Sequence, residues 1–277
     1  MPRNDEPSLI HNGTLCRASS LLFRIGDGVV RQGQGIFETI AVYRGKPFAM
    51  AAHYSRLCHG AEALELISPS LEDLNEQISR LLEANGLMKC EKVRLKITLA
   101  AGGVEPHQTQ VTLTTQPASE AFPPAHIVTL PYSRNEKGAL TGIKTVNYGE
   151  NVSALRYAKG KGADEGLFSN TVDQLCEGIW CNVFIFLDGQ WLTPPLTSGC
   201  LPGVTRQTLL DLADGSLPSI CEQNTAMSDL DRIEAGFLTS SIREIQLIES
   251  LDGRPLRSGA FPEINAWHRA YRDCATK

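Results

Sequence analysis

The sequence predicts an α/β (α+β) protein made of two segments of unequal size. Short β-prone apolar runs, such as Phe37–Tyr43, alternate with stretches of helical periodicity, such as Met50–Leu66. The stretch 116–124 holds three prolines and two alanines, a composition typical of a linker. A chain of 277 residues can form one large or two modest domains. We therefore expect a small domain over 1–117, a linker over 118–125 and a larger domain over 126–277.

The composition favours a soluble enzyme. With 42% hydrophobic residues and a net charge of −5, the chain is ordinary for a globular protein. Its apolar runs, such as Val183–Leu187, fall well short of the roughly 20 residues that span a bilayer. The polar N-terminus and eight scattered cysteines without a C-x-x-C pair predict a cytoplasmic protein with free thiols. An acidic pI of 5.7 disfavours nucleic acid as a partner, and the histidine spacing predicts no metal.

Local signals give the elements of the first segment. A turn is expected at Asn12-Gly13, and Pro69 ends the first helix. Ser70 with Asp73 opens a second helix, which ends at Asn85-Gly86. The elements predicted here are strands at Phe37–Tyr43, Val93–Leu99 and Gln110–Thr115, a helix at Met50–Leu66, and the helix that opens at Ser70 and ends at Asn85-Gly86.

The second segment has shorter strands and more loops. We expect strands at Ile127–Leu130, Glu165–Ser169, Asn182–Leu187, Trp191–Thr193 and Gly236–Ser240, and helices at Ser153–Lys161, Val204–Ala213 and near Ser228–Ile233.

Two common nucleotide motifs are excluded. Gly33-Gln34-Gly35 begins like a dinucleotide-binding loop, but Glu38 occupies the third glycine position and a strand follows instead of a helix. The chain also lacks a phosphate-binding G-x-x-x-x-G-K-[ST] loop and the G-x-S-x-G elbow of serine hydrolases.

The region from Lys144 to Arg206 carries the informative motifs. It contains, in order, Lys144-Thr-Val-Asn147-Tyr148, Cys176-Glu177-Gly178, Asn182-Val183-Phe184 and Leu201-Pro202-Gly203-Val204-Thr205-Arg206. This order and spacing resembles the class IV aminotransferases, the pyridoxal-phosphate fold-type IV family. The family includes branched-chain aminotransferases, D-amino-acid transaminases and aminodeoxychorismate lyases. The resemblance runs from about Asp27 to Ile245. It implies a smaller N-terminal domain, a larger C-terminal domain, the cofactor between them, and a homodimer.

The resemblance assigns the covalent chemistry to Lys144. An amine must hold the cofactor aldehyde as a Schiff base and move a proton at the substrate Cα. Glu177 matches the glutamate that hydrogen-bonds the pyridine nitrogen, since a carboxylate there stabilises the protonated ring.

The cofactor phosphate is expected at a helix start. The amides of Val204 and Thr205 open a helix after Gly203, and a helix N-terminus with hydroxyls and a bidentate cation suits an anion. In the family the arginine of an H-x-x-R-L helix clamps the phosphate, which here is Arg56. The remaining residues that the resemblance places near the cofactor are Ser240, Ser241, Asn182 and Tyr148. Arg206 is expected to be structural.

The residues expected to line the substrate side of the site, called the substrate wall below, differ from those of the relatives. Gln32 stands where branched-chain enzymes usually carry an aromatic residue, and Arg94 is a candidate replacement for their substrate-pocket arginine. Glu38 either belongs to this wall or is a core charge paired with an arginine. His107 is the nearby candidate for binding a substrate α-carboxylate.

Three functions remain open. The leading hypothesis is an aminotransferase that moves an amino group between an amino acid or primary amine and a 2-oxo acid. The second is an aminodeoxychorismate lyase, which releases pyruvate and 4-aminobenzoate. The third is a silent binding module that kept the fold. The identity of the donor and acceptor, and the preference for L, D or (R) substrates, stay undetermined.

Overall fold

The computed structural model describes residues 6–22, 24–103, 108–213, 215 and 217–276 as a mixed α/β fold. It divides into two compact units. The first unit comprises Met1–Glu120 and Ile143–Asn147, and the second comprises Ala121–Gly142 and Tyr148–Lys277.

The segment Ile143–Asn147 therefore belongs to the first unit, although we expected it within the domain 126–277. The reason is backbone pairing with the strand that begins at Gly35. Ile36 and Thr145 form an antiparallel bridge, and the Phe37 amide donates to the Lys144 carbonyl at 3.0 Å. Backbone groups of Lys144 are thus fixed to the first unit.

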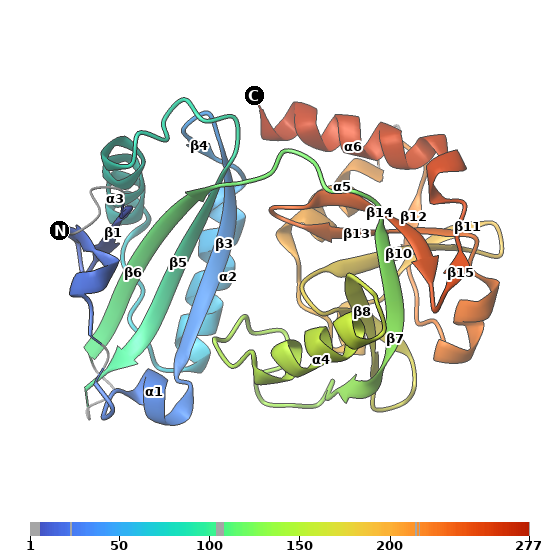
Figure 1. Cartoon of the computed structure of the whole chain (residues 1–277), viewed down its shortest axis with the longest axis horizontal. Coiled ribbons are helices and arrows are strands. Elements are labelled where there is room, and N and C mark those ends of the chain that lie inside the picture. The colour runs from blue at the N-terminus through green and yellow to red at the C-terminus, as the bar shows by residue number, and fades with distance from the viewer. Residues whose placement is uncertain (1–5, 23, 104–107, 214, 216, 277) are drawn as a thin grey trace. The chain divides into compact units, whose positions relative to one another are not determined.

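The first unit contains an antiparallel six-stranded sheet, ordered β2-β1-β6-β5-β3-β4 (Figure 1). Its strands are β1 Ser8–His11, β2 Thr14–Arg17, β3 Gly35–Tyr43, β4 Lys46–Pro47, β5 Val93–Gly102 and β6 Gln108–Pro117. Its helices are η1 Ala18–Ser20, α1 Gly28–Gln32, α2 Met50–Ala63 and α3 Leu71–Ala84. The β1–β2 turn is at Asn12-Gly13, as expected, and both residues have positive φ.

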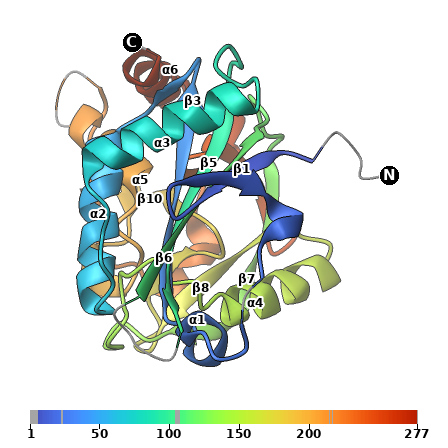
Figure 2. The same cartoon turned by 90° about the vertical axis from the view of Figure 1, so that its left-hand side faces the viewer.

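Helices α2 and α3 pack on one face of this sheet (Figure 2). Alternate residues of β5, such as Leu95 and Ile97, form the core with Leu57 of α2 and Leu74 of α3. The opposite face of β5 carries Arg94, Lys96 and Thr98. The start of α3 is fixed by Ser70, whose hydroxyl accepts a hydrogen bond from the Asp73 amide.

The second unit is built on a mixed sheet with the strand path β12-β11-β10-β13-β14-β7-β8-β9, and β15 pairs with β14. Its strands are β7 Ala125–Arg134, β8 Glu165–Asn170, β9 Leu175–Gly178, β10 Asn182–Leu187, β11 Gln190–Thr193, β12 Ile220–Glu222, β13 Ala235–Ser240, β14 Glu244–Leu251 and β15 Arg254–Pro255. Its helices are α4 Gly149–Gly160, η2 Leu196–Ser198, α5 Val204–Ala213, η3 Met227–Arg232, η4 Ser258–Ala260 and α6 Pro262–Ala275.

Several elements of the second unit were not predicted. Strand β9, strand β14 and helix α6 are the main ones. Helix α6 begins with Pro262, a favourable first helical residue, and buries Trp267 and Tyr271 on one face. The sequence did not predict strand β14, because the buried positions of this strand include the polar residues Glu244 and Gln246.

Among the residues that the structure describes, none of the helices has the length and apolar character needed to cross a bilayer.

Candidate active site

Lys144 lies beside β3, at the edge of the first unit's sheet. Its Nζ lies over the ring of Phe37, 4.6 Å from the ring centroid. An ammonium over an aromatic face is stabilised by the ring quadrupole. The Lys144 carbonyl accepts a hydrogen bond from the Phe37 amide, so the backbone at this position is anchored to β3.

A buried charged cluster lies next to this lysine. Glu38 of β3 is 1% exposed, and its two oxygens accept hydrogen bonds from Nε and Nη2 of Arg56 in α2. Glu38 is therefore a core charge paired with an arginine, one of the two expectations for it. Burial alone would raise the pKa of Glu38, but the Arg56 charge and the hydrogen bonds from Arg56 and His53 lower it to about 2.

His53 completes the cluster from one turn earlier in α2. Burial lowers its pKa, against the raising effect of Glu38, and the charges of Arg56 and Lys144 lower it further. Nδ1 of His53 lies 2.7 Å from Oε2 of Glu38, an ionised acceptor, so the ring proton sits on Nδ1.

In the second unit, Glu177 of β9 has both carboxylate oxygens engaged. Arg134 donates to Oε1 at 3.1 Å, and the Leu201 amide donates to Oε2 at 2.9 Å. Arg134 also stacks on Phe168 and donates to Glu150, so its guanidinium is held from three sides. The sequence did not single out Arg134, because no local pattern connects β7 to β9.

The start of α5 forms a tight backbone cradle. The amides of Val204 and Thr205 lie in the first helical turn, where intrahelical acceptors are missing. Asn182 donates from Nδ2 to the Leu201 carbonyl at 2.9 Å. A Cβ on Gly203 would lie 2.0 Å from Oδ1 of Asn182, so any larger residue there would require the Asn182 side chain to move. The predicted residues Asn182, Val204 and Thr205 are therefore close neighbours.

Strand β13 brings further hydroxyls to the same sheet. Thr239 pairs directly with Asn182, so their side chains share one face. The Thr239 hydroxyl is buried without a hydrogen-bond partner among the described residues. Ser240 accepts a hydrogen bond from the Arg243 amide, and Ser241 follows at the end of the strand. An unpartnered buried hydroxyl beside a helix start suits a site for a polar ligand.

Two other predicted residues have structural contacts in the second unit. Tyr148 packs against Trp180, with ring centroids 5.1 Å apart. Arg206 is 2% exposed and donates to the Pro194 carbonyl and to Glu222, which agrees with a structural role.

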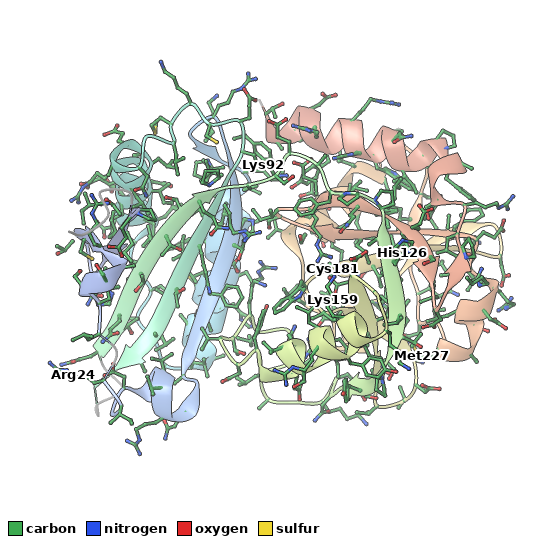
Figure 3. The ribbon with its side chains drawn as sticks, in the orientation of Figure 1. Arg24, Lys92, His126, Lys159, Cys181 and Met227 are labelled. Carbon is green, nitrogen blue, oxygen red and sulfur yellow. The ribbon has the colours of Figure 1, made fainter. Side chains whose placement is uncertain are left out.

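Buried polar pairs outside the predicted set also hold this unit together. Glu165, fully buried, pairs with Arg243 at 2.6 Å. Cys181, which Figure 3 labels, has its Sγ 3.6 Å from Nη1 of Arg243. Burial raises the pKa of Cys181, so it is a thiol and not a nucleophile.

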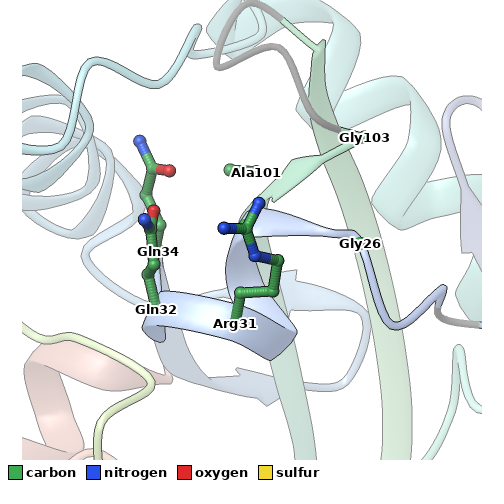
Figure 4. Close-up of a pocket in the computed structure, with 7 residues that line it drawn as sticks. Gly26, Arg31, Gln32, Gln34, Ala101 and Gly103 are labelled. Carbon is green, nitrogen blue, oxygen red and sulfur yellow. The ribbon is translucent and has the colours of Figure 1, made fainter.

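Among the wall residues, Gln32 lines a hollow in the first unit with a volume of about 240 Å³ (Figure 4). Arg31 and Gln34 line it too, and Figure 4 shows these side chains rising from α1 and the turn after it. Arg94 is not among its lining residues and lies farther along β5. His107 is outside the residues that the structure describes.

Comparison with known proteins decides the family. The model of the protein family described as "Amino-transferase class IV" matches residues 35–251, which are more than three quarters of the chain. The chain belongs to the class IV aminotransferase family.

Relatives within this family carry different names. A branched-chain-amino-acid aminotransferase-like protein of Arabidopsis thaliana is 26% identical over 259 residues, which cover 89% of this chain but 46% of that protein. The chain thus spans less than half the length of that relative. A D-alanine aminotransferase of Staphylococcus epidermidis is 27% identical over 84% of each chain. The crystal structure of a putative 4-amino-4-deoxychorismate lyase of Legionella pneumophila has a TM-score of 0.86 and 26% identity, over 93% of this chain and 97% of its own.

The residues of this family member are of the kinds that pyridoxal phosphate needs. A methyl group at Gly203 would clash with the present position of the Asn182 side chain, and Thr239 offers a buried hydroxyl without a partner among the described residues. Arg56 is oriented by Glu38, and Glu177 is a carboxylate fixed by two donors. Amine, carboxylate, guanidinium, hydroxyl and helix amides are the groups that an aldehyde, a pyridine nitrogen and a phosphate need.

Proposed function

We propose that this protein is a pyridoxal-phosphate-dependent aminotransferase, which transfers an amino group between an amino acid or primary amine and a 2-oxo acid. The observation that carries the proposal is the setting of Lys144. Its backbone pairs with β3, its amine lies 4.6 Å from the centroid of Phe37, and its charge acts on His53 of the cluster that also contains Glu38 and Arg56.

When bound, pyridoxal phosphate supplies an aldehyde that takes up amines and a ring that accepts electrons from the substrate Cα. In the proposal, the Lys144 amine would hold the cofactor and would take up and return a proton at the substrate Cα.

Other groups of the chain bind and orient. Glu177 would pair with the ring nitrogen and stabilise its protonated form, and Arg134 and the Leu201 amide hold the Glu177 carboxylate in place. Arg56 and the amides of Val204 and Thr205 bind the phosphate. We assign supporting contacts to Ser240, Ser241, Asn182 and Tyr148, and we assign the substrate wall to Gln32 and Arg94.

The test begins with cofactor uptake. The wild-type protein incubated with pyridoxal phosphate should absorb near the edge of the visible range, and borohydride should fix the label on the peptide containing Lys144. Lys144→Ala should lose the band and the label, whereas Lys137→Ala, which changes an exposed lysine, should keep both. Amino transfer from a panel of L-, D- and branched-chain amino acids and (R)-amines to pyruvate or 2-oxoglutarate should follow. A colourless wild-type protein, or a coloured one that turns over no donor, refutes the proposal.

A lyase is the second candidate. It is supported by the similarity to the structure from Legionella pneumophila whose name includes 4-amino-4-deoxychorismate lyase. The two reactions differ in their need for an acceptor, since only the lyase releases pyruvate from its substrate without an added oxo acid. Pyruvate release from aminodeoxychorismate alone would establish the lyase, and an obligatory acceptor would exclude it.

We further propose a homodimer located in the cytoplasm. Family resemblance supports the dimer, and eight free cysteines are in keeping with a reducing compartment. Light scattering after size exclusion should give twice the mass of the 30.2 kDa chain, and a monomer would refute the dimer.

A further inference from the structure

A buried carboxylate in the second unit links two segments that carry proposed cofactor residues. Glu165 begins β8 and is fully buried. Its Oε1 accepts a hydrogen bond from the Ile179 amide at 2.9 Å, and its Oε2 lies 2.6 Å from Nη1 of Arg243. One side chain therefore contacts two segments that are far apart in the sequence.

The first segment is the loop that joins β9 to β10. Ile179 lies two residues after Glu177, the carboxylate proposed for the ring nitrogen. Glu165 accepts a hydrogen bond from the Ile179 amide, and Asn151 of α4 donates one to the Ile179 carbonyl. The backbone just after Glu177 is therefore held from two sides.

The second segment is the turn between β13 and β14, which carries Ser240 and Ser241 and ends at Arg243. The Arg243 amide donates to Oγ of Ser240 at 3.2 Å, so the residue that pairs with Glu165 also closes the turn. Nη1 of Arg243 lies 3.6 Å from Sγ of Cys181, in the loop after β9. The guanidinium thus contacts the first segment directly as well as through Glu165.

Burial makes this link strong. The Arg243 side chain is 18% exposed and that of Glu165 is fully buried, so separating the pair would leave a charge in the interior without its partner. The pair of Arg232 with Asp188 in the same unit differs, because its partners are 50% and 64% exposed and are screened by water. The Glu165–Arg243 pair therefore opposes a relative shift of the two segments.

We infer that Glu165 and Arg243 are positioning residues that fix the separation between the Glu177 carboxylate and the hydroxyls of Ser240 and Ser241. The inference rests on the proposed function. Pyridoxal phosphate carries its ring nitrogen and its phosphate on one small, largely rigid frame. It binds tightly only where the groups that receive them are already at the matching separation.

A double-mutant cycle separates positioning from stability. Glu165→Gln keeps an oxygen for the Ile179 amide but removes the charge, and Arg243→Met removes the guanidinium. Each single variant leaves one buried charge unpaired, so its urea midpoint should fall. The double variant Glu165→Gln/Arg243→Met removes both charges and should recover most of that fall.

Cofactor affinity should not recover with stability. The link between the two segments is absent in all three variants, so the Kd for pyridoxal phosphate in equilibrium dialysis should rise about tenfold or more in each, the double variant included. Pyridoxal and inorganic phosphate each reach only one of the two segments. Their Kd values, measured by competition, should change by less than about threefold in the double variant.

Arg232→Met is the matched control, since it breaks the exposed pair with Asp188 and should leave both the urea midpoint and the Kd near those of wild type. The inference is overturned if the double variant recovers cofactor affinity together with stability, if none of the three variants changes the Kd, or if all three ligands weaken equally. In each of these cases the proposed function stands. If the wild type binds no pyridoxal phosphate, the proposed function itself fails.

Discussion

Glu38 and Arg56 form a bidentate pair, in which Nε donates to Oε1 and Nη2 donates to Oε2, each at 2.7 Å. Such a pair fixes the plane of the guanidinium as well as its position. Glu38 is thereby a positioning residue for Arg56. Nδ1 of His53 also contacts Oε2 of Glu38, at 2.7 Å. The orientation of the proposed phosphate-binding arginine thus depends on a carboxylate that is itself buried.

Replacing Glu38 by Gln should destabilise the protein by roughly 3 kcal/mol, because Arg56 is left mostly buried without its counter-charge. Urea unfolding measures the loss. Glu91→Gln is the matched control, since it breaks an arginine pair whose partners are 73% and 54% exposed, and it should cost less than about 1 kcal/mol. Equal losses in the two variants would contradict the role of the buried pair.

The same carboxylate should make stability depend on pH. The pKa of Glu38 is lowered from 4.5 to about 2, so its contribution is complete above pH 4.5 and is lost as the pH falls toward 2. The difference in melting temperature between wild type and Glu38→Gln should therefore be constant from about pH 7 to 5 and shrink below that range. A difference that stays constant down to about pH 3 would show that Glu38 does not titrate in this way.

Glu177→Gln should retain cofactor uptake but reduce turnover by about 100-fold, because a neutral amide does not stabilise a protonated ring nitrogen. Absorbance measures the uptake and amino transfer measures the turnover. Glu150→Gln is the control, because Glu150 is the other carboxylate that pairs with Arg134 and its side chain is 76% exposed. This variant should keep its turnover within about twofold of wild type. Turnover of Glu177→Gln close to that of wild type would remove Glu177 from the proposed role.

Thr239→Val should stabilise the protein without cofactor by about 1 kcal/mol, because it removes a buried hydroxyl that has no partner in the described part of the chain. Thr193 offers the opposite case, since its buried hydroxyl donates to the Val183 carbonyl at 2.8 Å. Thr193→Val should destabilise by a similar amount. Thermal unfolding of the two variants should therefore shift in opposite directions, and shifts of the same sign would contradict the assignment.

Elements with local signals were predictable from the sequence. Strand β10 and helix α5 have the predicted bounds, Asn182–Leu187 and Val204–Ala213, because an apolar run and a Pro-Gly helix start mark them. The start of α3 after Ser70 is also confirmed. Each of these signals depends only on residues a few positions apart.

Pairings between distant residues were not predictable in the same way. Two examples are the ion pairs of Arg134 with Glu177 and of Glu165 with Arg243. Both pairs depend on the order of the strands in the sheet, which no local sequence pattern specifies. The convergence of Lys96 and Lys144 on Phe37 likewise requires the register of β3 and β5 together with the return of segment 143–147. Motif resemblance proposed Lys144 and Glu177 as single residues, but the neighbours that tune them come from the fold.

The return of Ile143–Asn147 to the first sheet makes the chain pass between the two units at 120/121, 142/143 and 147/148. Neither unit can therefore be expressed as one continuous fragment. A fragment cut after residue 120 would encode the β3 edge without the backbone that covers it and without the amine at position 144, while the remaining fragment would carry that amine with no strand to hold it.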